Sequence, residues 1–394
     1  MRIGVVDFFS GCGGASTGFA MASTPDVSVE IVAGIDNDPH SCATYARMHD
    51  RPAHCVDIAD LAEDSALLAS FVSNWRLGDY DRVVMIGCAP CQGFAAHRKF
   101  IDEDDPRRHL FAVFCEIARK INPDAIFMEN VPDLLSRKHW KYYSTGRCLL
   151  EASDYHVRAQ IYNFAEFGLP QERFRTVILA LKEEFEMPDG FLEPEQFRTV
   201  RDAIGGLPPL EAGGMCPDDP MHRTSNHRQS TIDILKRVPV DGGNRPIGVG
   251  PACLDRARKS HGGYTDVYGR LRWDRPSVTI TARCRTPSCG RFAHPEQHRG
   301  LSIREAALLQ GFPKDFMFEG NFDDKYKQIG NAVPPIVAEQ FGKYLIQIML
   351  GKTTNFATRN GADIEAPVGP GFAVKINGIK RKRSREMIGG ATVA

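Results

Sequence analysis

The sequence of 394 residues has no apolar run of about 18 residues, the length that a membrane-spanning helix needs, so we expect no membrane span. Its beginning lacks a charged region followed by an apolar one and a small-residue cleavage site, so we expect no secretion signal. The cysteines, 11 at irregular spacing, disfavour a secreted disulfide framework. These absences predict a cytoplasmic globular protein with mostly reduced cysteines.

The formal net charge of zero hides an asymmetry. Residues 196–300 contain 17 Lys and Arg against 10 Asp and Glu, a local excess of +7, so the remainder carries −7. Cations concentrated in one region favour a polyanion-binding surface there. A solvated basic face without a partner is the alternative explanation.

The first half of the chain alternates short apolar runs with helical patterns. Apolar periodicity predicts helices over 39–48 and 109–121. The apolar runs predict strands at 3–9, 30–35, 82–87, 125–130, 156–162 and 176–181. Such alternation predicts an α/β fold with a mostly parallel sheet covered on both faces.

From about residue 187, Gly and Pro become dense and regular periodicity is lost. Helical periodicity returns at 302–310 and 336–350. We therefore predict a discontinuous first domain and a small loop-rich domain inserted into it, followed by a polar tail with the basic run KRKRSR, whose contact with nucleic acid is left open. The predicted boundaries are 1–186 with 300–351 for the first domain, 187–299 for the insertion and 352–394 for the tail.

The turn DFFSGCGGAS follows the first predicted strand, and open α/β sheets bind ligands at the carboxyl ends of their strands. Gly11, Gly13 and Gly14 let the backbone turn tightly and approach a ligand. Ser16 occupies the third glycine position of the dinucleotide motif, and no Walker lysine follows. This turn is therefore not a standard phosphate-binding loop.

Two carboxylates extend the prediction. Asp36 ends the second strand, where a carboxylate usually binds ribose hydroxyls, and Asp57 follows the third β-like segment, where it can bind an adenine amino group. Either one could instead be a helix N-cap. In order with Phe9 and Gly11, they suit a nucleoside without a phosphate tail and favour S-adenosylmethionine over NAD.

The stretch VVMIGCAPCQGF, residues 83–94, places Cys88 and Cys91 after an apolar run. Their spacing is that of a redox pair or half a zinc site. The chain is much larger than a thioredoxin-type protein, and only His97 and His109 follow as nearby metal ligands. The remaining interpretation is one nucleophile, Cys91, at the end of a strand.

Five motifs occur in order: PCQGF, MENV at 128–131, QERFR at 171–175, REAALLQGFP at 304–313 and QIGNAVPP at 328–335. With them the chain, from Asp7 to about Leu350, resembles the DNA (cytosine-5-)-methyltransferase family of the prokaryotic restriction–modification type. The resemblance implies a Rossmann-like S-adenosylmethionine-dependent domain and a loop-rich target-recognition domain.

The resemblance also implies roles for individual residues. Cys91 would add to carbon 6 of cytosine so that carbon 5 can accept the methyl group, and Glu129 would bind and protonate ring nitrogen 3. Asn130 would hold Glu129 in place, while Arg175 would bind the cytosine carbonyl oxygen. Arg173 and Gln92 complete the catalytic set, and Cys88 is a packed bystander.

S-adenosyl-L-methionine is the implied cofactor, and S-adenosyl-L-homocysteine the product. Phe9 would stack on the adenine, Asp36 would bind the ribose, and Asp57 with Ile58 would contact the adenine. The other implied cofactor residues are Ser10, Gly11, Gly13, Gly14, Asn37, Pro90, Asn331 and Val333.

The implied substrate is double-stranded DNA with the target base extruded, since a stacked cytosine cannot meet a thiolate. A loop at 95–108 would close over the DNA, and the insertion would read the major groove. The implied DNA contacts are Arg98, Lys99, Arg256, Arg258, Arg270, Arg272 and Arg283. The resemblance further implies a monomer near the nucleoid, with any restriction endonuclease acting separately.

Cys284, Cys289, His294 and His298 have a zinc-like spacing, but HPEQHRGLSIRE resembles the family's lead-in to the next helix, so we expect no metal. Three other functions compete with this one. An RNA (tRNA) cytosine-5 methyltransferase would share the chemistry, a silent DNA-binding regulator would be expected to lose Cys91 or Glu129, and a nicotinamide oxidoreductase leaves the PCQ and ENV elements unexplained.

Overall fold

A seven-stranded sheet organises the first part of the computed structural model, which describes residues 1–90, 105–261, 265–352, 355–358 and 363–369. Its order is β3-β2-β1-β4-β5-β7-β6. Only β7 runs against its neighbours, so the sheet is mostly parallel, as predicted. The strands are β1 (Arg2–Phe8), β2 (Ser28–Asp36), β3 (Ala53–Cys55), β4 (Arg82–Gly87), β5 (Ala125–Asn130), β6 (His156–Asn163) and β7 (Phe174–Leu181).

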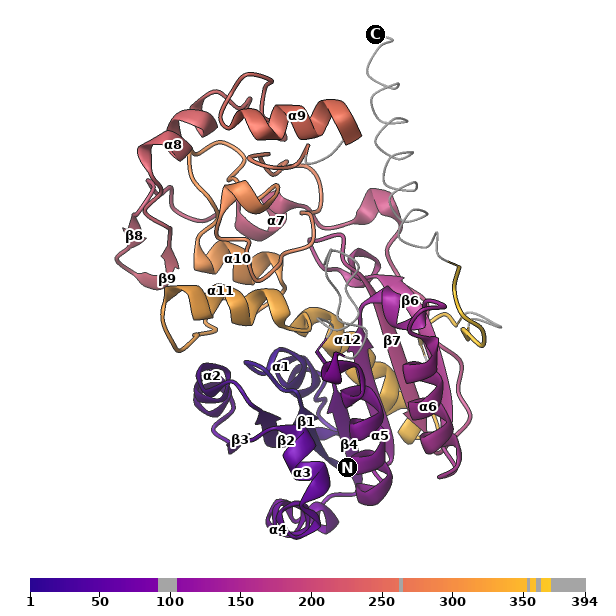
Figure 1. Ribbon diagram of the computed structural model, residues 1–394. Coiled ribbons are helices and arrows are strands. Elements are labelled where there is room, and N and C mark those ends of the chain that lie inside the picture. Colours follow the sequence, from indigo (N-terminus) through magenta and orange to yellow (C-terminus); the bar gives the residue numbers. More distant parts are fainter. Residues whose placement is uncertain (91–104, 262–264, 353–354, 359–362, 370–394) are drawn as a thin grey trace.

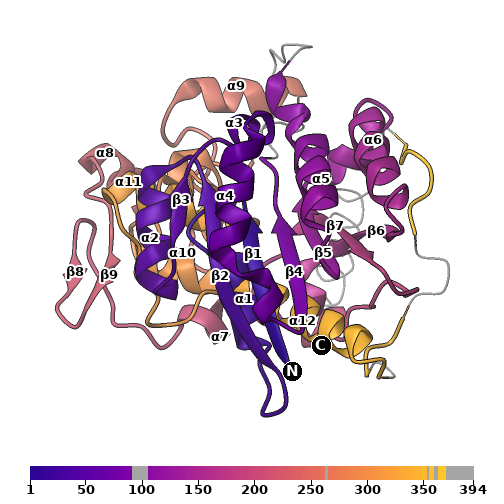
Figure 2. The ribbon, with the colours of Figure 1, turned by 90° about the horizontal axis from the view of Figure 1, so that it is seen from below.

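Helices cover both faces of this sheet (Figure 2). Alternate strand residues point to opposite faces, so Val5 packs in one apolar cluster and Val6 in the other. The first cluster includes α1 (Gly14–Met21), α2 (Pro39–His49) and α12 (Pro335–Met349). The second includes α3 (Ile58–Glu63), α4 (Ser65–Trp75), α5 (Leu110–Ile121) and α6 (Trp140–Glu151). This is the doubly covered α/β arrangement that the sequence predicts.

The loop-rich region forms a second lobe above the sheet (Figure 1). It contains little regular structure: α7 (Val200–Ile204), β8 (Met215–Cys216), β9 (Asp219–Arg223), α8 (Gln229–Lys236) and α9 (Ala252–His261). The helices α10 (Ile303–Leu309) and α11 (Phe322–Asn331) follow it. α10 shares an apolar cluster with Val200, Met221 and Leu271 of this lobe, whereas α12 packs on α1.

Within the described residues, no helix is both long and apolar enough to cross a membrane. The chain after α12 returns to the sheet, because Ile364 and Val368 pack against the second apolar cluster. The basic run at 380–385 lies outside the described residues.

Candidate active site

A cavity of about 490 Å³ lies at the carboxyl ends of β1, β2, β4 and β5. The second half of α11 and the chain just after it close the opposite side. Ten of the twelve predicted cofactor residues line this cavity: Phe9, Ser10, Gly11, Asp36, Asn37, Asp57, Ile58, Pro90, Asn331 and Val333. Glu129, Arg173 and Arg175 of the predicted catalytic set line the same space.

The turn between β1 and α1 is shaped by backbone conformations that most residues avoid. Phe9 has a positive φ of 56°, which is uncommon outside glycine and places a large ring at the cavity. Gly13 has a φ of 86° and is the N-cap of α1. Gly14 does not line the cavity; a Cβ there would lie 2.4 Å from the carbonyl oxygen of Val333. The glycines thus allow both the turn and the close approach of α1 to the segment after α11.

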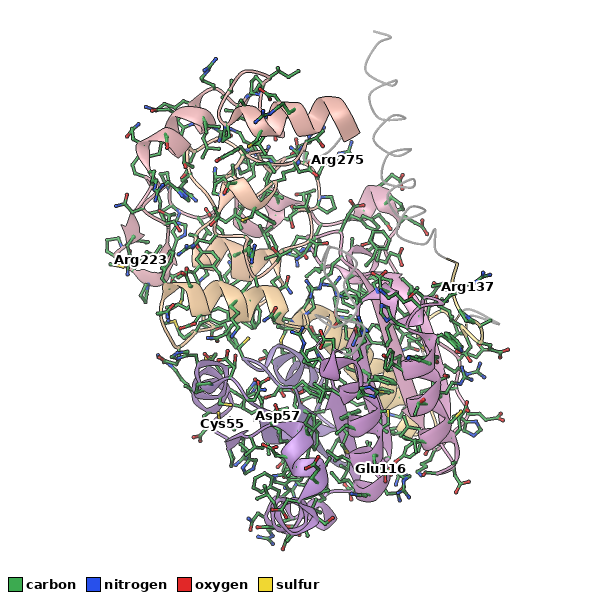
Figure 3. All side chains as sticks on the ribbon, viewed as in Figure 1. Cys55, Asp57, Glu116, Arg137, Arg223 and Arg275 are labelled. Atoms are coloured by element: carbon green, nitrogen blue, oxygen red, sulfur yellow. The ribbon has the colours of Figure 1, made fainter. Side chains whose placement is uncertain are left out.

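Asp36 holds the chain around the cavity with both carboxylate oxygens. Gly11 N donates to Oδ2 at 2.8 Å, and Asp38 N donates to Oδ1 at 2.9 Å. Asp57 Oδ1 accepts from Ala59 N, so Asp57 is the N-cap of α3 while also lining the cavity. Asp57 is labelled in Figure 3 where β3 leads into α3. Asp36 is not a helix cap; Asp38 caps α2.

Two buried polar side chains, Ser10 and Asp7, also line the cavity. Ser10 Oγ has no hydrogen-bond partner among the described residues. Asp7 accepts a hydrogen bond of 2.7 Å from Ser16 Oγ, which lies 3.0 Å from the hydroxyl of Tyr45. Burial raises the pKa of Asp7 to about 7, against the lowering effect of the Ser16 hydrogen bond. The cavity thus offers an unengaged hydroxyl and a carboxyl that titrates near neutrality.

Glu129 lies near the end of β5 and is almost completely buried. Arg175 Nε lies 2.9 Å from its Oε1, and Arg173 Nη2 lies 3.8 Å from the same atom. Oε1 nevertheless has no hydrogen bond of acceptable geometry among the described residues. A buried carboxylate oxygen that lies beside a cation without a well-directed hydrogen bond suits a group that receives its partner from a ligand.

Hydrogen bonds fix the surroundings of Glu129. Asn130 Nδ2 donates to the carbonyl oxygen of Ala89 at 3.1 Å, tying the end of β5 to the chain that follows β4. Arg173 donates to the carbonyl oxygens of Ile280 and Ala332, both at 3.3 Å, and so joins the catalytic sheet to two later segments. Cys91 and Gln92 lie outside the described residues.

Several cavity residues were missed by the sequence interpretation. Asp7 lies inside an apolar strand, and its neighbours gave no signal of a ligand site. Asp38 and Lys327 line the cavity as an ion pair that connects α2 to α11. The pattern of Asp38 followed by Pro39 is a recognisable helix start, but nothing in the sequence pairs it with Lys327, 289 positions later.

The prediction that Arg270 contacts DNA is wrong, because its side chain is fully buried. It donates to the carbonyl oxygens of Leu235, Val238, His294 and Gln297 and contacts His298 Nδ1. No donor is left to face a phosphate at the surface. Arg256, Arg272 and Arg283 are exposed. Arg98, Lys99 and the side chain of Arg258 lie outside the described residues.

The Cys and His residues with zinc-like spacing have other surroundings. His294 Nδ1 accepts from the backbone N–H groups of Glu296 and Gln297, and His298 contacts Arg270. Cys284 is buried and Cys289 exposed. Over the part of the chain that the structure describes, no group of three or more His, Cys, Asp or Glu side chains could hold a metal ion.

The sequence matches a known protein family and is similar to known relatives. The profile of "C-5 cytosine-specific DNA methylase" matches residues 3–347. The Type II methylase M.HgiDII of Herpetosiphon aurantiacus is 34% identical over 353 residues, 88% of this chain and 96% of its own length. The Type II methyltransferase M1.HphI of Haemophilus parahaemolyticus is also 34% identical, over 88% of both chains.

Solved structures resemble the fold. A protein from E. coli described as a prophage-encoded DNA modification methyltransferase has a TM-score of 0.67 at 22% identity, covering 88% of this chain and 99% of its own. The Dnmt2 methyltransferase of S. pombe has a TM-score of 0.54 at 19% identity, covering 89% and 99%.

Proposed function

Because the chain belongs to the C-5 cytosine-specific DNA methylase family and is an enzyme of that type, we propose that it methylates carbon 5 of an extruded cytosine in a specific duplex sequence through a covalent adduct of Cys91. The methyl donor is S-adenosylmethionine. The observation that carries the proposal is the shared cavity: the nucleoside-binding residues and Glu129 with its two arginines line one space.

The residues present fit the cofactor. Phe9 offers a ring for the adenine, and Asp36 and Asp57 offer carboxylate oxygens for the ribose and the adenine amino group. Ser10 Oγ, which is buried and unpartnered among the described residues, can donate to the methionine carboxylate. When bound, this cofactor supplies an electrophilic methyl group on a sulfonium.

The protein's own residues activate the cytosine. The Cys91 thiolate adds to carbon 6, which makes the ring electron-rich at carbon 5. Glu129, in its protonated form, donates its proton to nitrogen 3 as the thiolate adds. Its Oε1 lies beside Arg175 but accepts no well-directed hydrogen bond among the described residues, so the carboxyl group is available to the base. Arg175 donates to the cytosine carbonyl oxygen, and Arg173 keeps Glu129 in a cationic environment. After methylation, the carbon 5 proton passes to water, the thiolate departs, and nitrogen 3 returns its proton to Glu129, which restores the aromatic ring.

The lobe at 187–299 is proposed as the target-recognition domain. Its exposed Arg256, Arg272 and Arg283 are suited to phosphate and base contacts. Relatives named Type II methylases support a role in a restriction–modification pair. In that role the protein acts as a monomer in the bacterial cytoplasm, and the nuclease is a separate protein.

Methyl-group labelling tests this function. Tritium transfer from labelled S-adenosylmethionine to genomic DNA and to tRNA is measured for the wild type, Cys91→Ala and the matched control Cys88→Ala. We expect label in DNA that is lost in Cys91→Ala and retained within a few-fold in Cys88→Ala. Label in tRNA alone would replace the DNA proposal with RNA methylation, and label in DNA that survives Cys91→Ala would remove the covalent step.

A further inference from the structure

Two cysteines from different elements meet beside the part of the cavity that Asp36 and Asp57 line. Cys42 lies on α2 and is buried, whereas Cys55 ends β3 and is exposed. Cys42 Sγ lies 3.5 Å from the carbonyl oxygen of Asp36, and Val56 N donates to the same oxygen at 3.0 Å. Because Cys55 directly precedes Val56 and pairs with Asp36 across the two strands, the Cys42 thiol reaches the chain at Cys55.

The side chain of Cys55 points toward α2. Side chains alternate along a strand, and Ala53 of β3 packs on the apolar cluster that contains Tyr45 of α2. His54 points the other way and stacks on α4. Cys55 therefore shares the α2 face with Ala53, and its thiol interacts directly with that of Cys42.

The two thiols differ in which of them can react first. A thiolate, not a thiol, attacks a disulfide, and the attacking sulfur needs access to solution. Burial, followed by the charge of Asp36, raises the pKa of Cys42 to about 12, so this thiol stays protonated. Cys55 is exposed and can meet a dissolved disulfide. Since the fold does not stabilise a Cys42 thiolate, it gives the reduced pair no electrostatic advantage over an uncharged disulfide.

Both cysteines adjoin the cavity, although neither lines it. The residue just before Cys42 and the residue just after Cys55 are both lining residues. Figure 3 labels Cys55 and Asp57 at this end of β3. A hydrogen bond of 2.9 Å from Asn37 Nδ2 to Asp57 Oδ2 joins the two segments across the cavity edge. A bond between the two sulfurs therefore acts on the spacing of the cavity walls.

We propose that Cys42 and Cys55 form a redox site, at which a small disulfide such as glutathione disulfide oxidises the pair to a protein disulfide that weakens nucleoside binding in the adjoining cavity. The Cys55 thiolate attacks glutathione disulfide, which forms a mixed disulfide and releases one glutathione thiolate. The Cys42 sulfur then bonds to that of Cys55, and its proton passes to the second departing glutathione. Two protein thiols are thus oxidised while one glutathione disulfide is reduced to two glutathione molecules.

The disulfide changes the reduced geometry in two ways. It removes the hydrogen bond from Cys42 to the Asp36 carbonyl oxygen, and it holds the two cysteine Cβ atoms about 3.8 Å apart. α2 is then fixed to β3, so a covalent bond sets the spacing between Asn37 and Asp57. We expect the affinity for S-adenosylhomocysteine to fall about tenfold, within the usual range of coupling between two sites. This effect rests on the proposed function for its ligand, whereas formation of the disulfide does not.

Peptide mapping tests the pair itself. The protein is equilibrated with glutathione disulfide, its remaining thiols are blocked with iodoacetamide, and it is digested with trypsin. Trypsin cuts after Arg47 but not between Arg51 and Pro52, so the disulfide joins fragment 3–47 to fragment 48–76. Because fragment 3–47 also contains Cys12, the variant Cys42→Ser is needed to assign the bond.

We expect the joined fragments in the wild type and in the control Cys253→Ser, which removes an exposed thiol of the second lobe. In Cys42→Ser, the Cys55 sulfur should instead keep one glutathione. In Cys55→Ser, the Cys42 thiol should stay unmodified. Absence of the joined fragments from the wild type, or their formation in Cys42→Ser, overturns the proposal.

Calorimetry of S-adenosylhomocysteine with reduced and oxidised protein tests the effect on the cavity. Oxidation should lower the affinity about tenfold in the wild type and in Cys253→Ser, and leave Cys55→Ser within about twofold. Cys88 lines the cavity and is present in every variant, so a loss through its modification would appear in Cys55→Ser as well.

An equal loss in Cys55→Ser, or no loss in a wild type that contains the joined fragments, overturns the coupling to the cavity. By linkage, saturating S-adenosylhomocysteine should lower the equilibrium constant for oxidation, measured in glutathione buffers, by the same factor. If the reduced wild type binds no S-adenosylhomocysteine, the proposed function fails, and the joined fragments alone decide the redox site.

Discussion

The arginines of the seven-stranded sheet and those of the loop-rich lobe have different surroundings. Arg173 and Arg175 lie at the start of β7 or just before it, beside a cavity, with Glu129 as their charged neighbour. Arg270 and Arg299 are fully buried in or next to the lobe and donate chiefly to main-chain carbonyl oxygens or to a buried carboxylate. The same residue type therefore lies beside a buried carboxylate at a cavity in one region and joins loops in the other.

Backbone hydrogen bonding explains the difference. In the sheet, strand ladders satisfy the N–H and C=O groups, so side chains at the strand ends remain available for a ligand. The lobe has short helices and a two-stranded ribbon, and many of its carbonyls need other donors. An arginine has five donors and can join several loops at once, as Arg270 does for 235–238 and 294–297. The +7 excess at 196–300 therefore overstates the positive charge that this region exposes.

The largest expected effect lies on the sheet side. Glu129→Gln keeps the shape of the side chain but removes its ability to protonate cytosine. We expect methyl transfer to fall about 10²- to 10⁴-fold, the usual contribution of a positioned acid–base group. Binding of S-adenosylmethionine, measured by calorimetry, and the thermal unfolding midpoint serve as controls. A rate within about tenfold of the wild type, with the fold intact, would remove Glu129 from the chemistry.

A neighbouring pair of arginines tests the comparison within the lobe. Arg270→Met leaves several buried carbonyl oxygens without donors and is expected to lower the free energy of unfolding by about 3 kcal/mol or more. Arg272→Met, at an exposed position, should leave the urea unfolding midpoint unchanged while reducing the salt slope of DNA binding by about 1. Equal stability of the two variants would contradict the architectural role of Arg270.

The sheet could be predicted from the sequence in more detail than the loop-rich lobe. β4 and β5 have the predicted bounds, because buried parallel strands are continuous apolar runs. The glycine turn, Asp36 and Asp57 meet at one cavity because their places follow from strand order. The sequence alone does not tell the buried Arg270 from the exposed Arg272. The burial of Arg270 depends on contacts with residues 235–238 and 294–297, which are distant in sequence and have no repeating apolar pattern that predicts them. The pairing of Asp38 with Lys327 likewise depends on a tertiary contact.

The buried carboxyl groups of Glu305 and Asp7 make the stability of the two regions depend on pH in opposite ways. Burial alone would raise the pKa of Glu305, but the hydrogen bonds and charge of Arg299 lower it from 4.5 to about 2. Its pairing therefore stabilises the fold above pH 4.5, and this contribution, about 3 kcal/mol, is lost as the pH falls from 4.5 towards 2. Asp7 has the opposite sign: with a pKa raised from 3.8 to about 7, it makes the fold less stable as the pH rises through that window, by about 4 kcal/mol.

Urea unfolding between pH 3 and 8 measures both effects. Asp7→Asn should flatten the loss of stability between pH 4 and 7, whereas Glu305→Gln should flatten the loss below pH 4.5 and lower stability at neutral pH. Identical pH profiles for the wild type and Asp7→Asn would mean that the Asp7 carboxyl is ionised in the fold like any surface acid.

The smallest effect that we predict concerns cofactor affinity. Asp36→Asn retains one oxygen where the carboxylate accepts hydrogen bonds from both Gly11 N and Asp38 N, so the turn around the cavity loses one of its two ties. Together with the weaker acceptor offered to the ribose, this should reduce S-adenosylmethionine affinity by about 10- to 100-fold, or about 1.4–2.7 kcal/mol. Asp60→Asn, on the exposed side of α3, is the matched control. S-adenosylhomocysteine should lose affinity to the same degree, because the two molecules share the nucleoside; a loss confined to the charged cofactor would mean that Asp36 acts through its charge rather than through the ribose contact.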